Sequence, residues 1–143
     1  PETEADRQPD EASHRRKISR RIAIATKEVT REQWRAFSAS NEVLLADSEL
    51  LKTYIRTDDS PMTGLTWYEA AHYCNWLSEQ EGILEDQWCY EKNEENKYGP
   101  GMKAKDNFLE LTGYRLPTEA EWFYAAFSNT LLSQFGTTSK AIA

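Results

Sequence analysis

Two cysteines, Cys74 and Cys89, are the side chains of this chain best suited to redox or metal chemistry. A thiol reacts or binds a metal as its thiolate, so it needs a reachable site that lowers its pKa. The pair does not have C-x-x-C spacing, and no second pair completes a zinc site. Because cysteine is among the most often buried residues, we expect both to be core residues, with a catalytic role as the less favoured alternative.

The chain has two histidines, which are too few for a metal centre. His72 lies two positions before Cys74, and residues i and i+2 of a helix do not face each other. We therefore expect His72 on the surface. His14 lies in a polar segment without companion ligands. A copper or zinc site needs more nitrogen and sulfur ligands than these, so no metal site is predicted in this chain.

Three charged residues and one tryptophan could also serve a site. For Arg115, Glu119 and Glu121 we favour structural roles. Glu121 stands three residues after Thr118, as in a capping box, and an arginine satisfies several buried acceptors at once. Trp88 falls in a loop and is the best candidate for an exposed aromatic that binds a ligand. No residue is predicted to be catalytic or to bind a cofactor.

Three helices and one short strand are expected to position these residues. Each helix begins with a capping box, in which a threonine and the third residue after it satisfy each other's backbone N–H groups. The predicted helices are 31–38 after Thr30, 67–81 after Thr66 with a stop at Gly82, and 119 onward after Thr118. A strand is predicted at Ile22 and Ile24, where apolar and other residues alternate.

Helical spacing predicts which helix faces are buried. The expected core positions are Trp34 and Phe37 in the first helix, Ala70, Tyr73, Cys74 and Leu77 in the second, and Trp122 with Ala125 or Ala126 in the third. A single convincing strand lacks the partners that a sheet edge requires. The pattern therefore indicates part of a larger α+β domain.

Composition excludes two classes of function. The 143 residues, 39% hydrophobic and 29% charged, suit one packed domain or part of one. The formal charge of −7 makes nucleic-acid binding unfavourable, and no apolar run is long enough for a membrane span. The sequence gives no prediction of localisation.

Three ordered segments resemble the formylglycine-generating enzyme, or sulfatase-modifying factor, family of bacterial type. They are ATKEVT at 25–30 followed by Trp34 and Phe37, GLTWYEAAHYCNWL at 64–77, and GYRLPTEAEWFYAA at 113–126. The last segment is long and highly specific. The resemblance covers nearly the whole chain, so residues 1–143 are expected to be the N-terminal part of a single domain of this family, truncated at both ends.

The resemblance implies a C-type-lectin-like α+β fold, here incomplete, with about three helices, few short strands and much irregular structure. It implies an oxygen-dependent oxidation of a sulfatase cysteine to formylglycine, with copper held by two cysteines and with calcium-binding loops. In the family these lie in the C-terminal part, so copper and calcium belong to the complete domain and the catalytic cysteines are expected to be absent here. The cysteine at the Cys74 position often forms a disulfide with a downstream partner.

Two departures from the family pattern argue against a standard active site, and one insertion is longer than usual. Phe123 replaces a usual acidic residue, Phe127-Ser128-Asn129 replaces the common R-G-G or R-A-G, and the insertion over 79–107 is longer than the link in many members. The leading hypothesis is an inactive fragment of an oxidoreductase-type domain, whose partners are its own missing C-terminal half and a protein or peptide substrate. One alternative is a non-catalytic binding module on the same fold, such as an accessory domain of a bacterial serine/threonine kinase. Another is a non-haem-iron oxidase domain of the sulfoxide-synthase kind.

Overall fold

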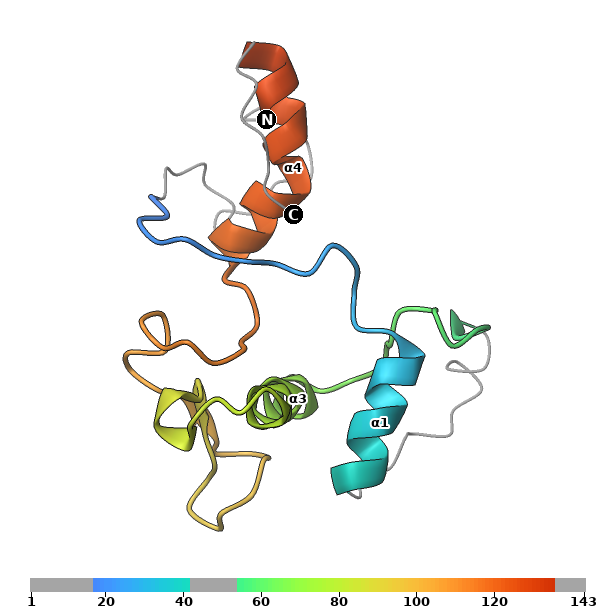
Figure 1. Ribbon diagram of the computed structural model, residues 1–143, viewed down its shortest axis with the longest axis vertical. Coiled ribbons are helices and arrows are strands. Elements are labelled where there is room, and N and C mark those ends of the chain that lie inside the picture. Colours follow the sequence, from blue (N-terminus) through green and yellow to red (C-terminus); the bar gives the residue numbers. More distant parts are fainter. Residues whose placement is uncertain (1–16, 42–53, 136–143) are drawn as a thin grey trace, which may run out of the picture. The chain divides into compact units, whose positions relative to one another are not determined.

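The computed structural model describes residues 17–41 and 54–135, with side chains as far as Phe127. The elements in chain order are α1 (Arg31–Asn41), α3 (Trp67–Gln80), the 3-10 helix η1 (Glu85–Gln87), strands β1 (Tyr90–Glu91) and β2 (Lys103–Ala104), and α4 (Glu119–Phe135) (Figure 1). They fall into two compact units, a central unit of residues 25–116 and a terminal unit that combines residues 1–24 with 117–143.

Helix α1 begins where its capping box predicts. The Thr30 N–H donates to Gln33 Oε1 at 2.9 Å, and the Gln33 N–H donates to Thr30 Oγ1 at 3.3 Å. The two reciprocal bonds satisfy N–H groups that the first turn leaves without partners. Trp34 and Phe37 are buried as predicted, with 1% and 0% of their surface exposed. The helix runs three residues beyond the predicted end.

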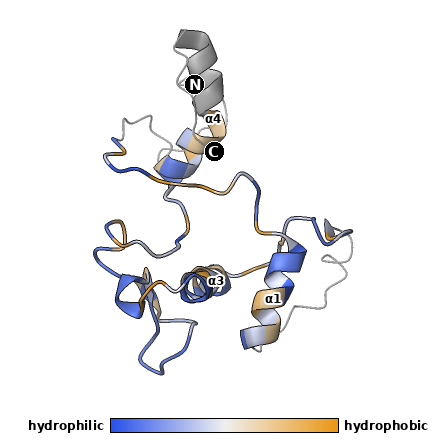
Figure 2. Ribbon diagram, viewed as in Figure 1, coloured by the Kyte–Doolittle hydropathy of each residue, from blue (hydrophilic) through white to orange (hydrophobic). Residues whose placement is uncertain are grey.

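Helix α3 is the central element of the central unit. Thr66 and Glu69 form its capping box, and the helix ends before Gly82, whose φ of 71° suits glycine. In Figure 1 α3 is viewed along its axis while α1 runs across the view, so the two helices cross. Figure 2 shows hydrophobic colouring on parts of both helices and hydrophilic colouring at the ends of α1.

Two clusters of buried side chains hold the central unit together, and α3 contributes to both. One consists of Trp34, Phe37 and Tyr73, with Val29 and Trp76 among the side chains packed against it. The Trp34 and Tyr73 rings are stacked with centroids 5.6 Å apart. The other cluster consists of Ala71, Cys74, Cys89, Tyr90 and Met102. Helix α3 therefore joins α1 to the segment that follows η1.

The predicted core stripe of α3 is partly right. Tyr73 and Cys74 are buried, whereas Ala70 and Leu77 are only half-buried. Asn75 and Ser78 are buried instead, at 1% and 0% exposure. Helical spacing of apolar residues misses these two positions because both are polar.

Strands β1 and β2 form a short antiparallel pair, with Tyr90 opposite Ala104 and Glu91 opposite Lys103. They close a hairpin whose long loop is coloured mostly as hydrophilic in Figure 2. Thr30 and Pro61 add an isolated antiparallel bridge. The described part of the chain therefore mixes helices with a small sheet, as expected from the sequence.

The strand predicted at Ile22 and Ile24 is wrong. Residues 21–25 have no regular structure, and Ile24 is 43% exposed. Alternation indicates a strand only where a neighbouring backbone pairs with it. Among the residues that the structure describes, none pairs with this segment.

Helix α4 belongs to the terminal unit and begins with the predicted cap. The Thr118 N–H donates to Glu121 Oε2 at 2.8 Å, and the Glu121 N–H donates to Thr118 Oγ1 at 3.3 Å. The predicted core face is wrong, because Trp122 is 55% exposed and Ala125 and Ala126 are also exposed. The apolar residues of α4 are distributed around its whole circumference, so helical spacing selects no single buried face.

No helix within 17–41 or 54–135 combines the length and the apolar character that crossing a bilayer requires.

Candidate functional site

Both cysteines are free thiols in the core of the central unit, as the sequence predicts. Burial raises the pKa of Cys74 to about 12, and the neighbouring Cys89 adds to the rise while Arg115 opposes it. Burial also raises the pKa of Cys89, with Arg115 and Lys105 opposing. The Cys89 Sγ lies 3.3 Å from the Gly113 carbonyl oxygen, to which its S–H donates. At neutral pH both groups are therefore protonated, unreactive thiols.

A buried amide on α3 fixes the hairpin. The Asn75 Nδ2 donates to the Tyr90 carbonyl at 2.8 Å and to the Tyr98 hydroxyl at 3.2 Å. Its Oδ1 accepts from the Tyr90 N–H at 3.3 Å. Because a buried amide is costly without partners, these bonds select one position for the hairpin against α3.

A buried hydroxyl on the same helix fixes the segment before α4. The Ser78 Oγ donates to the Cys74 carbonyl at 2.9 Å and accepts from the Tyr114 N–H at 2.8 Å. Gly113 lies against η1, and a Cβ there would stand 2.5 Å from the Gln87 carbonyl oxygen. The highly specific motif at 113–126 thus begins at a close backbone approach that requires glycine.

His72 is half-buried against aromatic rings, so the prediction of a surface histidine is only partly right. Its ring stacks on Tyr98 with centroids 3.8 Å apart and meets the edge of Phe37 at 4.9 Å. Burial, assisted by the positive charge of Lys92, lowers the pKa of His72 to about 4. It is therefore neutral near pH 7. His14 lies outside the described residues.

The charged candidates have structural contacts. Glu121 is 1% exposed and, besides its capping bonds, accepts from Arg20 Nη2 at 2.6 Å. The Arg115 Nη1 donates to the Leu116 carbonyl at 3.1 Å, and its guanidinium lies 5.8 Å from the centre of the Phe108 ring. Glu119 is exposed in the first turn of α4. The sequence gives no signal for Arg20 as the partner of Glu121.

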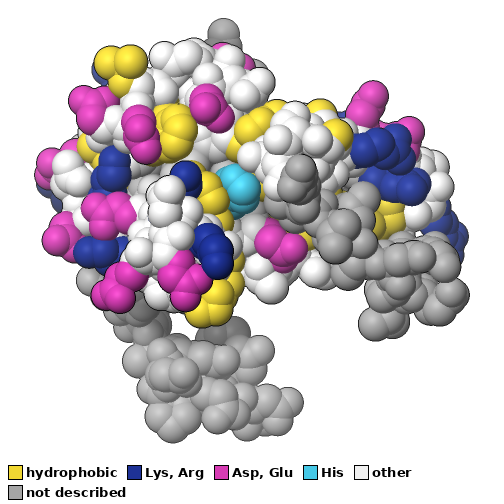
Figure 3. Space-filling view, turned by 90° about the horizontal axis from the view of Figure 1, so that it is seen from below, with side chains coloured by type: hydrophobic (Ala, Val, Ile, Leu, Met, Phe, Trp, Pro, Cys, Tyr) yellow, Lys and Arg dark blue, Asp and Glu magenta, His cyan; other side chains and the backbone are white. Residues whose placement is uncertain are grey.

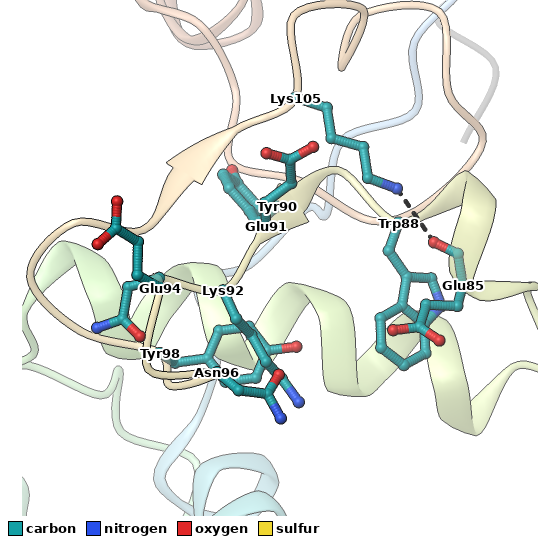
Figure 4. A pocket seen from close by; sticks show the side chains of 10 residues that line it. Glu85, Trp88, Tyr90, Glu91, Lys92, Glu94, Asn96, Tyr98 and Lys105 are labelled. Atoms are coloured by element: carbon teal, nitrogen blue, oxygen red, sulfur yellow. Dashed lines mark hydrogen bonds between the residues drawn. The ribbon is translucent and has the colours of Figure 1, made fainter.

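An open pocket of about 330 Å³ lies on the central unit between η1 and the β1–β2 hairpin. Figure 4 shows its side chains, with the bond from Lys105 to the Glu85 carbonyl drawn as a dashed line. The pocket combines aromatic rings with carboxylates, amides and two lysines. Its lining consists of Glu85, Trp88, Tyr90, Glu91, Lys92, Asn93, Glu94, Asn96, Tyr98 and Lys105.

The pocket loop is braced by one asparagine. The Asn93 Oδ1 accepts from the N–H groups of Glu95 and Lys97 at 3.1 and 2.9 Å. Its Nδ2 donates to the Pro100 carbonyl at 3.0 Å. Asn96 takes a φ of 60°, a value that asparagine tolerates better than most residues. The bonds of Asn93 thus hold the loop in one shape.

Trp88 lines the pocket but is less accessible than predicted. Its side chain is half-buried, and its indole N–H donates to the Ile83 carbonyl at 2.8 Å. The sequence located this aromatic in the right loop. It did not identify the carboxylates and lysines around it, because their clustering depends on the hairpin pairing.

The described residues do not fit the metal that the family resemblance implies. Copper ligation by cysteine needs accessible, ionisable sulfur, and Cys74 and Cys89 are buried with raised pKa values. In the described part of the chain, no three His, Cys, Asp or Glu side chains gather as a metal site would require. The pocket, rather than the thiols, is the candidate site.

Comparison with known proteins gives the family. The model of the sulfatase-modifying factor enzyme 1-like domain matches residues 2–140. A curated protein of Paenibacillus barcinonensis called Chaperone protein LppX is 30% identical over 111 residues, which cover 72% of this chain and 35% of that protein. The chain thus spans about a third of that relative's length, and no solved structure matches it. Since the family model matches almost the whole chain, this protein belongs to the sulfatase-modifying factor enzyme 1-like domain family.

Proposed function

We propose that this chain is a non-catalytic part of a formylglycine-generating-enzyme-like domain, on the C-type-lectin-like fold expected of that family. It provides scaffold and polypeptide recognition, and the oxidative chemistry depends on thiols other than Cys74 and Cys89. The observation that carries this proposal is the burial of both cysteines in one packed cluster.

Family membership makes the state of the thiols decisive. Oxidation of a substrate cysteine with copper requires sulfur that ionises and reaches solvent. This chain has two cysteines, and both are buried with raised pKa values. Their contacts are those of core residues, because they pack with Ala71, Tyr90 and Met102.

Thiol labelling and an oxidation assay test this proposal together. We expect iodoacetamide at pH 8 to label neither cysteine in the folded chain and both cysteines in urea. We also expect the chain, supplied with copper and oxygen, not to convert the cysteine of a sulfatase peptide to formylglycine. Mass spectrometry of the peptide measures this reaction. Turnover that disappears in Cys74→Ala or Cys89→Ala would overturn the proposal.

A second candidate function is a non-catalytic module that holds a client polypeptide. It is favoured by an exposed aromatic cluster on α4 formed by Trp122, Phe123 and Phe127, each 42% to 55% exposed. The Phe123 and Phe127 rings lie 4.8 Å apart. Contiguous apolar surface of this kind marks interaction sites. The relative named as a chaperone agrees with this candidate.

The second candidate is tested with a permanently unfolded client. Reduced, carboxymethylated α-lactalbumin should bind the chain in fluorescence anisotropy, and Phe123→Ser should weaken that binding. Leu84→Ser is the matched control, because Leu84 is a single leucine at 73% exposure outside the cluster. Equal weakening by both variants would contradict a specific client site on α4.

A further inference from the structure

We propose that the pocket between η1 and the β1–β2 hairpin is a docking site for a basic polypeptide segment, with one lysine or arginine side chain seated in the pocket. This inference concerns a different surface from the thiols and from the aromatic cluster on α4. It therefore stands or falls separately from both proposals for function.

The first support is the charge of the surrounding surface. Residues 79–110 contain nine Asp or Glu and four Lys, a net charge of −5. Two of the lysines are paired, Lys97 with Glu95 at 2.9 Å and Lys103 with Glu91 at 3.3 Å. Figure 3 shows acidic side chains spread over the face that includes this hairpin, with basic ones between them. Such a field attracts a cationic partner and speeds its encounter.

The second support is the state of the charges that line the pocket. Glu85 and Glu94 form no ion pair with any residue in the described ranges. Lys105, by contrast, is engaged, because its Nζ donates to the Glu85 and Asp86 carbonyls at 3.1 and 3.2 Å. The lining thus offers free acceptors for a cation, whereas one of its two ammonium groups already has partners.

The third support is a cation already placed on an aromatic ring of the lining. The Lys92 Nζ lies 5.3 Å from the centre of the Tyr98 ring, a distance at which a cation is attracted to the ring. Tyr98 in turn is fixed by its stack on His72 and its bond from Asn75. The chain's own ammonium therefore occupies a position that an incoming ammonium or guanidinium would use.

The fourth support is that the pocket is formed in advance. Asn93 braces its loop with three hydrogen bonds, and Asn75 fixes the hairpin to α3. A loop that is already ordered loses little conformational entropy when it binds a ligand. A polypeptide can therefore dock here without remodelling the hairpin.

Hexalysine is the probe that tests the inference. Titration of the full chain, labelled with nitrogen-15, should shift the amide resonances of residues 91–98 and the indole resonance of Trp88 at low salt. Hexaglutamate should leave these resonances unchanged. Raising the ionic strength should weaken the hexalysine interaction, because exposed charges are screened over about 8 Å at physiological salt.

Two charge-matched double variants locate the site. Glu85→Gln with Glu94→Gln should weaken hexalysine binding about fivefold to tenfold, because it removes two carboxylates from the lining. Glu32→Gln with Glu110→Gln changes the net charge by the same amount at exposed positions outside the pocket, and should weaken binding less than twofold. Equal weakening by both doubles would show attraction by overall charge alone and would overturn the proposal.

A gain of affinity provides a test that misfolding does not mimic. Lys92→Met removes the internal ammonium from the Tyr98 ring and from the lining. Hexalysine should then bind a few-fold more tightly than it binds the unmodified chain. Unchanged or weaker binding by a folded Lys92→Met variant contradicts the proposed seat, as does hexalysine binding that leaves the hairpin resonances unmoved.

Discussion

Helices α3 and α4 begin with the same kind of capping box, but they differ in how many of their side chains are buried. Each starts at a threonine whose hydroxyl caps the third residue, a glutamate that bonds back to the threonine. Yet α3 buries Ala71, Cys74 and Asn75, whereas α4 exposes four aromatic side chains. The capping box therefore determines where a helix begins, and remote partners determine what it buries.

Tryptophan truncations give the strongest test of this comparison. Trp34→Ala removes a side chain at 1% exposure and should lower the free energy of unfolding by about 4 kcal/mol, because it leaves a cavity in the aromatic cluster. Trp122→Ala removes a side chain at 55% exposure and should change the free energy of unfolding by less than about 0.5 kcal/mol. Urea unfolding measures both. Similar losses would show that α4 is as well packed as the central unit.

A pair of glycines tests how tightly the central unit is packed. Gly113→Ala should cost about 2 kcal/mol, because the new Cβ would stand 2.5 Å from the Gln87 carbonyl oxygen and 3.1 Å from Trp88 Cα. Gly99→Ala is the control, since a Cβ there has no neighbour within 4 Å. Urea unfolding of the two variants should differ clearly. A neutral Gly113→Ala would refute the close approach.

The histidine stack makes the stability of the central unit depend on pH. The pKa of His72 is about 4 in the folded chain and about 6.5 in the unfolded chain. The unfolded state therefore binds the proton more readily than the folded state. The contribution of neutral His72 to stability is fully present above pH 6.5 and is lost as the pH falls toward 4. Between pH 7 and 5 we expect a loss of about 1 to 1.5 kcal/mol, reduced for partial solvent screening.

His72→Phe is the control for this pH effect, because it preserves an aromatic ring in the stack without a titratable group. Urea unfolding at pH 7 and pH 5 should show a smaller loss for the variant than for the parent chain. If both lose the same stability, another group is responsible.

The smallest expected effects come from the two caps. Thr66→Ala should lower the free energy of global unfolding by about 1 kcal/mol, since α3 joins both buried clusters. Thr118→Ala should fray the start of α4, with little effect on urea unfolding of the central unit. Hydrogen exchange resolved by residue separates the two outcomes. Equal global losses would show that both helices belong to one cooperative unit.

The sequence predicts the local features of this fold well. The caps at Thr30, Thr66 and Thr118 are correct, because both members of each box lie within four residues of chain. Burial of Trp34, Phe37 and both cysteines is correct as well. These features depend on side-chain type and short spacing alone.

Features that depend on distant partners were not predictable. Asn75 is buried because Tyr90 and Tyr98, which follow later in the chain, hydrogen-bond to it. Ser78 is buried because the Tyr114 backbone hydrogen-bonds to its hydroxyl. The pocket depends on the pairing of β1 with β2. Strands of two residues are too short to be recognised from their composition. The prediction of a strand at Ile22 and Ile24 is wrong for the same reason, because a strand is stable only when a neighbouring strand pairs with it.

The contact between Ser78 and Gly113 has a consequence for how this sequence can diverge. The Ser78 hydroxyl holds the Tyr114 N–H and lies 3.2 Å from the place that a Cβ on Gly113 would occupy. A Cβ at position 113 would also stand 2.5 Å from the Gln87 carbonyl oxygen, and no change at Ser78 relieves that contact. We therefore expect relatives that share this hairpin to keep the glycine even where another residue replaces the serine.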